Sequence, residues 1–507
     1  MSAGPASPNP HQRAPVAAEA HDASDALTLK RGFTFRSAFS LAFADVSPIV
    51  ALYTVFSIIV ALAGVGFWLA FPVVLAGQLL VAAVFGEVSS RWPLAGSVYQ
   101  WSRHLVGPRY GWFTAWAYIW GLTIALAALA YGGAGFLLGA VGDTTPATIT
   151  HAFVALGLVV FGSGLNIAGR VFLKVFLGLS IVAEIVGSLG LGTYLLARYQ
   201  VNPISALFHG VPHASGWLGG PFIAAMAVVG WSFLGFESAG SIAEEVRDPE
   251  RNVPWAIFLG LAAVGIVVLY SGLALDLAVP NISAVLAGKV ADPIATTLTA
   301  HLGSGAAQAF QFLFLFGFLA SFTAVQSAVS RCIWASARDR VLPGHSFLVR
   351  LTRRERLPWA SILVTAVVAG ALVFISASKI YAVLINFTNA GFYIAFLMPV
   401  LGAGYVRFRG GWTAGPWSLG RWGKPITYVA GAWLIVEIVN IAWPRSSLYG
   451  AGIVRWSVLF MIAILGIAGA VISRWVFRDG GRHTRQGELL FQTDPAAAEA
   501  EPLPATP

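Results

Sequence analysis

Cysteine and charge are both scarce in this sequence. Its single cysteine, Cys332, cannot form an intramolecular disulfide. No group of cysteine and histidine residues has metal-ligand spacing, so we expect neither a metal nor a cofactor. Only 10% of the residues are charged, against roughly 25% in soluble domains. This composition argues against a soluble globular protein.

Long apolar segments take the place of the missing charge. Hydrophobic residues make up 57% of the chain, and a membrane-spanning helix needs about 20 mostly apolar residues. Twelve segments qualify, which predicts an all-α membrane protein with twelve transmembrane helices. These segments are residues 37–62, 67–85, 111–138, 148–167, 172–197, 221–243, 255–279, 306–337, 358–376, 380–404, 426–443 and 453–475. They lie in one predicted domain, residues 30–478, between polar stretches 1–29 and 479–507 that we expect to be disordered cytosolic tails.

Basic residues are distributed unequally between the two sides of the membrane. If the amino terminus is cytosolic, 26 of the 31 Lys and Arg residues fall in the tails, at inner helix ends or in inner connections. This asymmetry follows the positive-inside rule. It predicts a multi-pass protein of the plasma or inner cell membrane with both termini in the cytoplasm. Because anionic lipid and the insertion bias account for the clusters, the formal net charge of +9 does not indicate a nucleic-acid partner.

Two of the predicted spans contain residues that interrupt helices. In the first span, Pro48 has no N–H group and clashes with the preceding turn. The sixth span carries Gly230 and Gly235 and then a carboxylate, Glu237. Proline and glycine also serve as kinks or packing positions in membrane helices. However, interruptions five helices apart are typical of inverted-repeat transporters, in which the free backbone ends form a midplane site. A zwitterion suits such a site, because N–H groups can meet its carboxylate and carbonyl groups its ammonium.

Three stretches of the sequence resemble the amino acid-polyamine-organocation (APC) superfamily. The most specific is GWSFLGFESA at 230–239, followed by EEVRDPERNVP at 244–254. The others are PLAGSVYQW at 93–101 and ARDRVLP at 337–343. They occur in order over about half of the chain. The sequence differs from the Gly-Ser-Gly of many members in the first span, where it has Val46, Ser47 and Pro48, a feature that points towards the GABA and choline branch.

This resemblance implies a fold, a mechanism and a binding site. The fold would be the leucine-transporter (LeuT) type, a 5+5 inverted repeat with discontinuous helices 1 and 6. Its repeats would be residues 37–199 and 221–406, followed by two further helices in 426–475. The mechanism would be alternating access in the lipid bilayer, with an amino acid or related amine as substrate. The implied substrate-binding residues are Ser47, Pro48, Tyr118, Gly121, Leu122, Trp231, Leu234 and Gly235.

Acidic residues inside predicted spans are costly, at about 2.5 to 3.5 kcal/mol each on insertion scales. A carboxyl group among apolar neighbours can bind a proton on one side of the membrane and release it on the other. Asp45, Glu184 and Glu237 are therefore our candidates for proton coupling, with buried structural hydrogen bonds as the alternative. Glu437, outside the ten-helix core, is expected to be structural or to lie at an oligomer contact.

Charged residues also face one another at the inner ends of the sixth and eighth spans. We interpret Glu244, Glu245, Arg331 and Arg338 as candidates for an inner gate of ion pairs. Solvated loop charges would satisfy the same pattern nearly as well.

The leading hypothesis is a proton-coupled permease that imports an amino acid. The alternatives are an exchanger of amines, a choline or polyamine permease, and a receptor-like protein that binds without transporting. An enzyme would need a nucleophile with a base, or a metal cluster, and no intramembrane histidine or cysteine set supplies one. We therefore expect no enzymatic activity.

Overall fold

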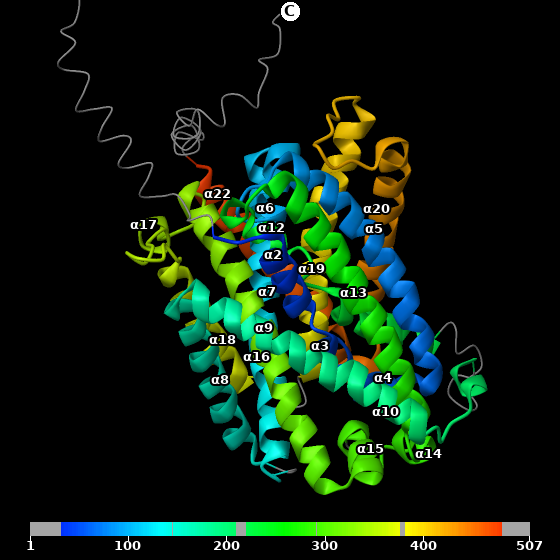
Figure 1. Ribbon diagram of the computed structural model, residues 1–507. Helices are drawn as coiled ribbons and strands as arrows, with labels where there is room; N and C mark the ends of the chain where they lie inside the picture. The colour runs from blue at the N-terminus through cyan, green and yellow to red at the C-terminus, as the bar shows by residue number, and fades with distance from the viewer. Residues whose placement is uncertain (1–31, 144–145, 209–219, 291, 376–380, 479–507) are drawn as a thin grey trace, which may run out of the picture.

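The structure is a computed structural model that describes residues 32–143, 146–208, 220–290, 292–375 and 381–478 (Figure 1). Within these ranges the chain is all-helical, with one isolated bridge between Phe33 and Val246. The predicted tails, 1–29 and 479–507, lie outside the described residues.

The α-helices follow one another along the whole described chain. In order they are α2 (Phe35–Val46), α3 (Pro48–Tyr53), α4 (Phe56–Ala63), α5 (Ala70–Arg91), α6 (Val98–Leu105), α7 (Pro108–Ala140), α8 (Thr148–Ala168), α9 (Arg170–Glu184), α10 (Leu191–Arg198), α11 (Gly220–Val229), α12 (Ser238–Ser241), α13 (Pro249–Ala278), α14 (Ile282–Leu286), α15 (Pro293–Leu302), α16 (Ser304–Arg338), α17 (His345–Leu348), α18 (Trp359–Ile375), α19 (Tyr381–Phe408), α20 (Gly423–Ala442), α21 (Ser446–Tyr449) and α22 (Ser457–Val476). Short 3-10 turns are η2 (Val65–Leu69), η4 (Ile204–Phe208), η5 (Gly230–Phe233), η6 (Ala243–Glu245), η7 (Gly420–Trp422) and η8 (Gly452–Trp456), and η3 (Ile185–Gly190) is a π-helix.

Eleven helical stretches of the described chain are long and apolar enough to cross a membrane. They coincide with eleven of the twelve segments predicted from the sequence. The remaining segment, 358–376, contains α18, whose described part has 17 residues. This length is at the lower limit for a spanning helix. The structure therefore supports a multi-pass membrane protein, with eleven clear spans in the described ranges.

The helices pack in two groups that share a long interface. In one group, α13 packs along α5 and α2, and α12 contacts both α2 and α13. In the other, α7 packs along α16 and α8, and α18 contacts all three. α16 and α2 join the groups at the centre of the molecule. By contrast, only 11% of the residues in the most hydrophobic stretch of the span that contains α22 are buried, against 83% for α16. α22 therefore lies at the periphery, with its aliphatic side chains facing outwards.

The bundle has two distinguishable ends. Figure 1 shows α6, α12 and α17 towards one end, which we call the α6 end. α14 and α15 lie at the opposite end, which we call the α15 end. The bridge between Phe33 and Val246 also places the start of α2 beside the loop that follows η6. Each interrupted span thus has one half towards the α6 end and one half towards the α15 end.

Candidate functional site

The first interruption separates α2 from α3. α2 ends at Val46, and Ser47 has a φ of 49°, so the chain turns before α3 begins at Pro48. Proline suits this position because the first residue of a helix has no intrahelical use for its N–H. The Asp45 carbonyl accepts a hydrogen bond of 2.7 Å from the Ser321 hydroxyl of α16. The predicted break is therefore present, and a neighbouring helix satisfies part of its exposed backbone.

The second interruption separates α11 from α12. α11 changes at Gly230 into the 3-10 turn η5, and the chain is then extended up to Gly235, whose φ is 96°. A residue with a Cβ adopts such a φ only with strain. A Cβ on Gly235 would also lie 2.3 Å from Asp45 Oδ1. The Ser232 hydroxyl donates to the Ala51 carbonyl of α3 over 2.5 Å. The two broken spans therefore contact each other at their breaks.

A small cavity lies between the two breaks. It has a volume of about 20 Å³, which is room for about one water molecule. An amino acid does not fit in this volume, so binding one requires the surrounding helices to move apart. The lining residues are Asp45, Val46, Val50, Ala125, Leu129, Trp231, Leu234, Ser321, Val325, Thr388 and Phe392.

Buried polar atoms without protein partners lie at this cavity and beside the second break. Asp45 is 5% exposed and Glu237 is fully buried. The Tyr118 hydroxyl donates to Glu237 Oε1 over 2.7 Å. Glu237 Oε2, Asp45 Oδ2 and Thr388 Oγ1 have no hydrogen-bond partner among the described residues. Since buried polar groups are nearly always hydrogen-bonded, these atoms indicate a site for a polar ligand.

Glu184 reaches the first break from the end of α9. Its carboxylate accepts hydrogen bonds from the Ser47 hydroxyl and, over 2.8 Å, from the backbone N–H of Ile49. Glu184 is 1% exposed and forms no ion pair within the described ranges. The π-helix η3 follows it directly, and such π-bulges are frequent at functional sites. A buried carboxylate thus holds the first turn of α3 in place.

Several predicted substrate-binding residues lie at the breaks. Trp231 and Leu234 line the cavity. Ser47 is fully buried, and its hydroxyl is bound to the Glu184 carboxylate. Pro48 and Gly235 shape the backbone at the two breaks.

The structure differs from the prediction for α7. Tyr118, Gly121 and Leu122 were expected to line the pocket, but the lining residues from this helix are Ala125 and Leu129. The Tyr118 hydroxyl instead donates to the Glu237 carboxylate at the second break. Gly121 lies where α7 crosses close to the backbone of α19. α7 therefore turns the residues of its next turn towards the cavity.

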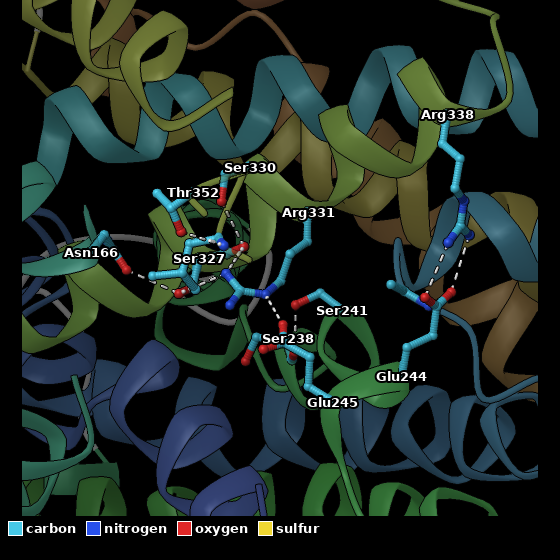
Figure 2. A network of polar contacts seen from close by, with 12 residues as sticks. Asn166, Ser238, Ser241, Glu244, Glu245, Ser327, Ser330, Arg331, Arg338 and Thr352 are labelled. Carbon is cyan, nitrogen blue, oxygen red and sulfur yellow. Dashed lines mark hydrogen bonds and ion pairs between the residues drawn. The ribbon is translucent and has the colours of Figure 1, made fainter. Parts of the chain in front are cut away.

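The four charges proposed as an inner gate form two ion pairs at the α6 end (Figure 2). Arg331 Nε donates to Glu245 Oε1 over 2.6 Å, and both side chains are almost fully buried. Arg338 donates two hydrogen bonds of 3.1 Å to the Glu244 carboxylate, in a pair that is partly exposed. Figure 2 also shows Arg331 beside Ser327, whose hydroxyl and carbonyl accept from Nη1. The pairing is observed, and its role as a gate stays a prediction.

A third ion pair, which the sequence reasoning missed, lies next to these two. Asp339 Oδ2 accepts from Arg103 Nη1 over 2.8 Å, from the Tyr99 hydroxyl over 2.6 Å and from Gln100 Nε2 over 3.1 Å. Burial and the Asp339 carboxylate raise the pKa of the Tyr99 hydroxyl, which therefore remains a donor. Tyr99, Gln100 and Asp339 lie in two of the stretches that carry the family resemblance, and Arg103 lies two residues after the first of them. Their spacing could not show that α6 folds against the end of α16.

Comparison with known proteins adds an independent finding. Residues 33–471 match the family model described as amino acid permease. The amino-acid permease BAT1 of Arabidopsis thaliana is 23% identical over 91% of this chain and 94% of its own length. The choline transporter of Saccharomyces cerevisiae is 25% identical, covering 72% of this chain and 67% of its own. The branched-chain amino acid permease BcaP of Lactococcus lactis is 26% identical, covering 65% and 72%. The range matched by the family model contains both breaks, the cavity and the ion pairs.

Proposed function

The chain belongs to the amino acid permease family, and from this premise we propose that it imports an amino acid or a related small amine together with a proton. Family membership indicates a membrane transporter of amino acids rather than an enzyme. Proton coupling, inward transport and the identity of the substrate-binding residues are what we propose beyond family membership.

One observation carries the proposal. The two broken spans meet at their breaks around a cavity that holds unpaired buried polar atoms. Carboxylates in such a place suit a small solute with an ammonium group. The cavity has space for only about one water molecule, so a substrate would be bound only when the surrounding helices move apart. This arrangement is what alternating access requires.

The substrate would lie against residues of both breaks. Asp45 supplies a carboxylate to the ammonium group, and Trp231 and Phe392 supply aromatic faces that also attract cations. Leu234 supplies apolar surface next to the second break. Of the eight residues first proposed for the pocket, we retain Ser47, Pro48 and Gly235 as shaping residues.

Glu184 is our principal candidate for the proton carrier. Its carboxylate holds the Ser47 hydroxyl and the Ile49 N–H at the start of α3. Protonation would remove the negative charge that makes these hydrogen bonds strong. Binding of a proton would thereby loosen the first break, which lies at the substrate cavity. Asp45, which lines the cavity, and Glu237, which is buried at the second break, remain secondary candidates.

The architecture that we propose is the LeuT type, with repeats 37–199 and 221–406 and two additional helices in 426–475. The α6 end would be cytoplasmic, together with both termini, in the plasma or inner cell membrane. The Glu245–Arg331 and Glu244–Arg338 pairs would then close the cytoplasmic side. Movement of the group that contains α2, α5, α12 and α13 against the group that contains α7 and α16 would open it.

Uptake into proteoliposomes tests this function. Purified protein would be screened by thermal shift against amino acids, GABA, polyamines and choline, and the stabilising compound would be offered in labelled form with and without a pH gradient. We expect the gradient to drive accumulation. Uptake that ignores the gradient but rises strongly with internal substrate would show exchange instead. Saturable binding without flux would show a receptor.

A second candidate substrate class is an amine without a carboxylate, such as choline or a polyamine. The unpaired Asp45 Oδ2 at the cavity favours it, and one relative is named a choline transporter. The same thermal-shift screen distinguishes the two classes, because only a zwitterion-selective site rejects choline.

A further inference from the structure

A second group of buried polar side chains lies where α5, α19 and α20 meet beside α11. It consists of Gln78, Asn389, Tyr393, Trp433 and Glu437, which we call the rear cluster. All of these except Trp433 are fully buried. The Tyr393 hydroxyl lies near the Gln78 amide and the Glu437 carboxylate. The Trp433 ring packs onto Gly77, beside Gln78, where a Cβ would overlap it.

The rear cluster is rich in polar atoms that lack protein partners. Six atoms have no hydrogen-bond partner among the described residues: Gln78 Nε2 and Oε1, Asn389 Oδ1, the Tyr393 hydroxyl, Trp433 Nε1 and Glu437 Oε1. Such groups normally bind ordered water or a ligand when protein partners are absent. Both donors and acceptors are present, with a single carboxylate. This chemistry suits a proton held on the carboxylate among water molecules better than it suits a divalent cation, which prefers several carboxylates.

The rear cluster shares its walls with the substrate cavity. On α19, Thr388 and Phe392 line the cavity, and the residues that follow each of them, Asn389 and Tyr393, belong to the rear cluster. At the second break, Trp231 lines the cavity. The preceding residue, Gly230, lies so close to Tyr393 that an added Cβ would be 3.2 Å from its hydroxyl. A change in the rear cluster can therefore move both α19 and the second break, which line the cavity.

The same helices also hold α11 in position. Asn389 Nδ2 donates to the Ala227 carbonyl over 2.9 Å, and Asn440 Nδ2 donates to the Ile223 carbonyl over 2.9 Å. Asn440 Nδ2 also donates to Glu437 Oε2 over 3.2 Å. One amide thus connects the Glu437 carboxylate to the backbone of α11. α11 is the half of the broken span that leads from the break towards the α15 end.

We propose that the rear cluster is a second proton-binding site, centred on Glu437, that controls how firmly α11 docks on α19 and α20. It deepens the transport function proposed above and rests on it, because α11 would form the outer half of the moving span. A neutral carboxyl lets α11 stay packed. A charged carboxylate draws water to the rear cluster and weakens the contacts of α11.

Few other titratable groups lie near the Glu437 carboxylate. Tyr393 faces it from α19, and Arg445, which follows α20, influences it from a distance while donating to the Asn440 carbonyl and Oδ1. Tyr449 acts on Arg445 and donates to the Ile441 carbonyl. α5 contributes the uncharged Gln78. The charge state of the rear cluster thus depends mainly on Glu437.

Infrared difference spectroscopy on the reconstituted full chain tests the site without requiring transport. Wild-type protein should show a carboxyl C=O band that disappears as pH rises, and Glu437→Gln should lack it. Glu184→Gln is the matched control and should keep the Glu437 band. Tyr393→Phe, which keeps the ring, should move the midpoint of the band by about one pH unit. An unaltered set of bands in Glu437→Gln would overturn the proposal.

Hydrogen exchange, corrected for intrinsic pH dependence, tests the effect on α11. In wild type, amides 223–229 should exchange about tenfold faster above the midpoint than below it, whereas Glu437→Gln should be insensitive to pH. Equal pH dependence in both proteins would refute the control of α11. If a pH gradient fails to drive uptake while the Glu437 infrared band and the hydrogen exchange of α11 behave as described, proton symport is wrong. The proposal that Glu437 binds a proton and controls α11 is then still supported.

Discussion

At the scale of single residues, the interaction of Ser47 with Glu184 links a titratable group to a break in the backbone. Ser47 has the positive φ that ends α2, its oxygen accepts from the Val50 N–H at the start of α3, and its hydroxyl donates to Glu184. A glycine could supply the φ but not the hydroxyl. The serine therefore makes the geometry of the break sensitive to the charge of its partner.

Replacing Glu184 with Gln should separate binding from energy coupling. Glutamine keeps the shape and can still accept from the Ile49 N–H, but it cannot exchange a proton. We expect substrate binding to remain measurable by thermal shift, while accumulation driven by a pH gradient falls to the level seen without one. Ser47→Ala is the companion variant, because it leaves the carboxylate in place and removes one of its donors. Full gradient-driven accumulation in Glu184→Gln across the accessible pH range would refute the role of Glu184.

Replacing Gly235 with Ala should damage the second break. The φ of 96° would strain alanine by about 1–3 kcal/mol, and its Cβ would force the Asp45 carboxylate from its position. We expect at least about tenfold weaker substrate binding, which corresponds to about 1.4 kcal/mol, measured by titration of purified protein. Gly157→Ala is a matched control in α8, since nothing lies within 4 Å of its added Cβ. Equal affinity in the two variants would count against contact between the breaks.

At the scale of helical elements, two neighbouring ion pairs should behave differently because their burial differs. The Glu245–Arg331 pair is 0% and 2% exposed, whereas Glu244 and Arg338 are 20% and 11% exposed. Removing one partner of a buried pair leaves an uncompensated charge, at a cost of about 3–5 kcal/mol. Exposed pairs contribute only about 0–1 kcal/mol.

Arg331→Met should therefore lower the melting temperature far more than Arg338→Met. The double variant Glu245→Gln with Arg331→Met should recover part of the loss, because the buried carboxylate is no longer charged. Thermal unfolding in detergent, monitored by fluorescence, measures all three. Similar losses in the two single variants would show that burial does not distinguish the pairs.

The sequence predicted those features of the elements that arise from local chemistry. Pro48 and Gly235 have backbone restrictions of their own, so the breaks could be placed before any contact was known. The π-helix after Glu184 has no comparable signal, because its glycines, Gly187 and Gly190, are also common in regular membrane helices. The cavity residues Ala125 and Leu129 were missed because the rotation of α7 depends on how its glycine crosses α19. Spacing alone places a residue on a helix face but does not say which neighbour that face meets.

At the scale of the whole molecule, ion pairs at the α6 end connect its two groups of helices. Glu244 and Glu245 lie in η6, directly after the broken span that packs with α2 and α13, and Arg331 and Arg338 belong to α16 in the other group. A further ion pair joins Glu87 of α5 to Arg407 of α19. If the groups rock as rigid bodies, these contacts must separate together whenever the α6 end opens.

The single cysteine makes this opening measurable. Cys332 is fully buried next to Arg331 and lies near the Tyr99 and Tyr118 hydroxyls, between the ion pairs and the cavity. Arg338→Gln removes a partly exposed pair and should shift the population towards the open form. A loss of up to about 1 kcal/mol corresponds to a shift of up to about fivefold, so alkylation of Cys332 by a maleimide should accelerate by up to about that factor. The charge-swapped double variant Glu244→Arg with Arg338→Glu restores the attraction and should react as slowly as wild type. An unchanged alkylation rate in Arg338→Gln would mean that this pair does not hold the α6 end closed.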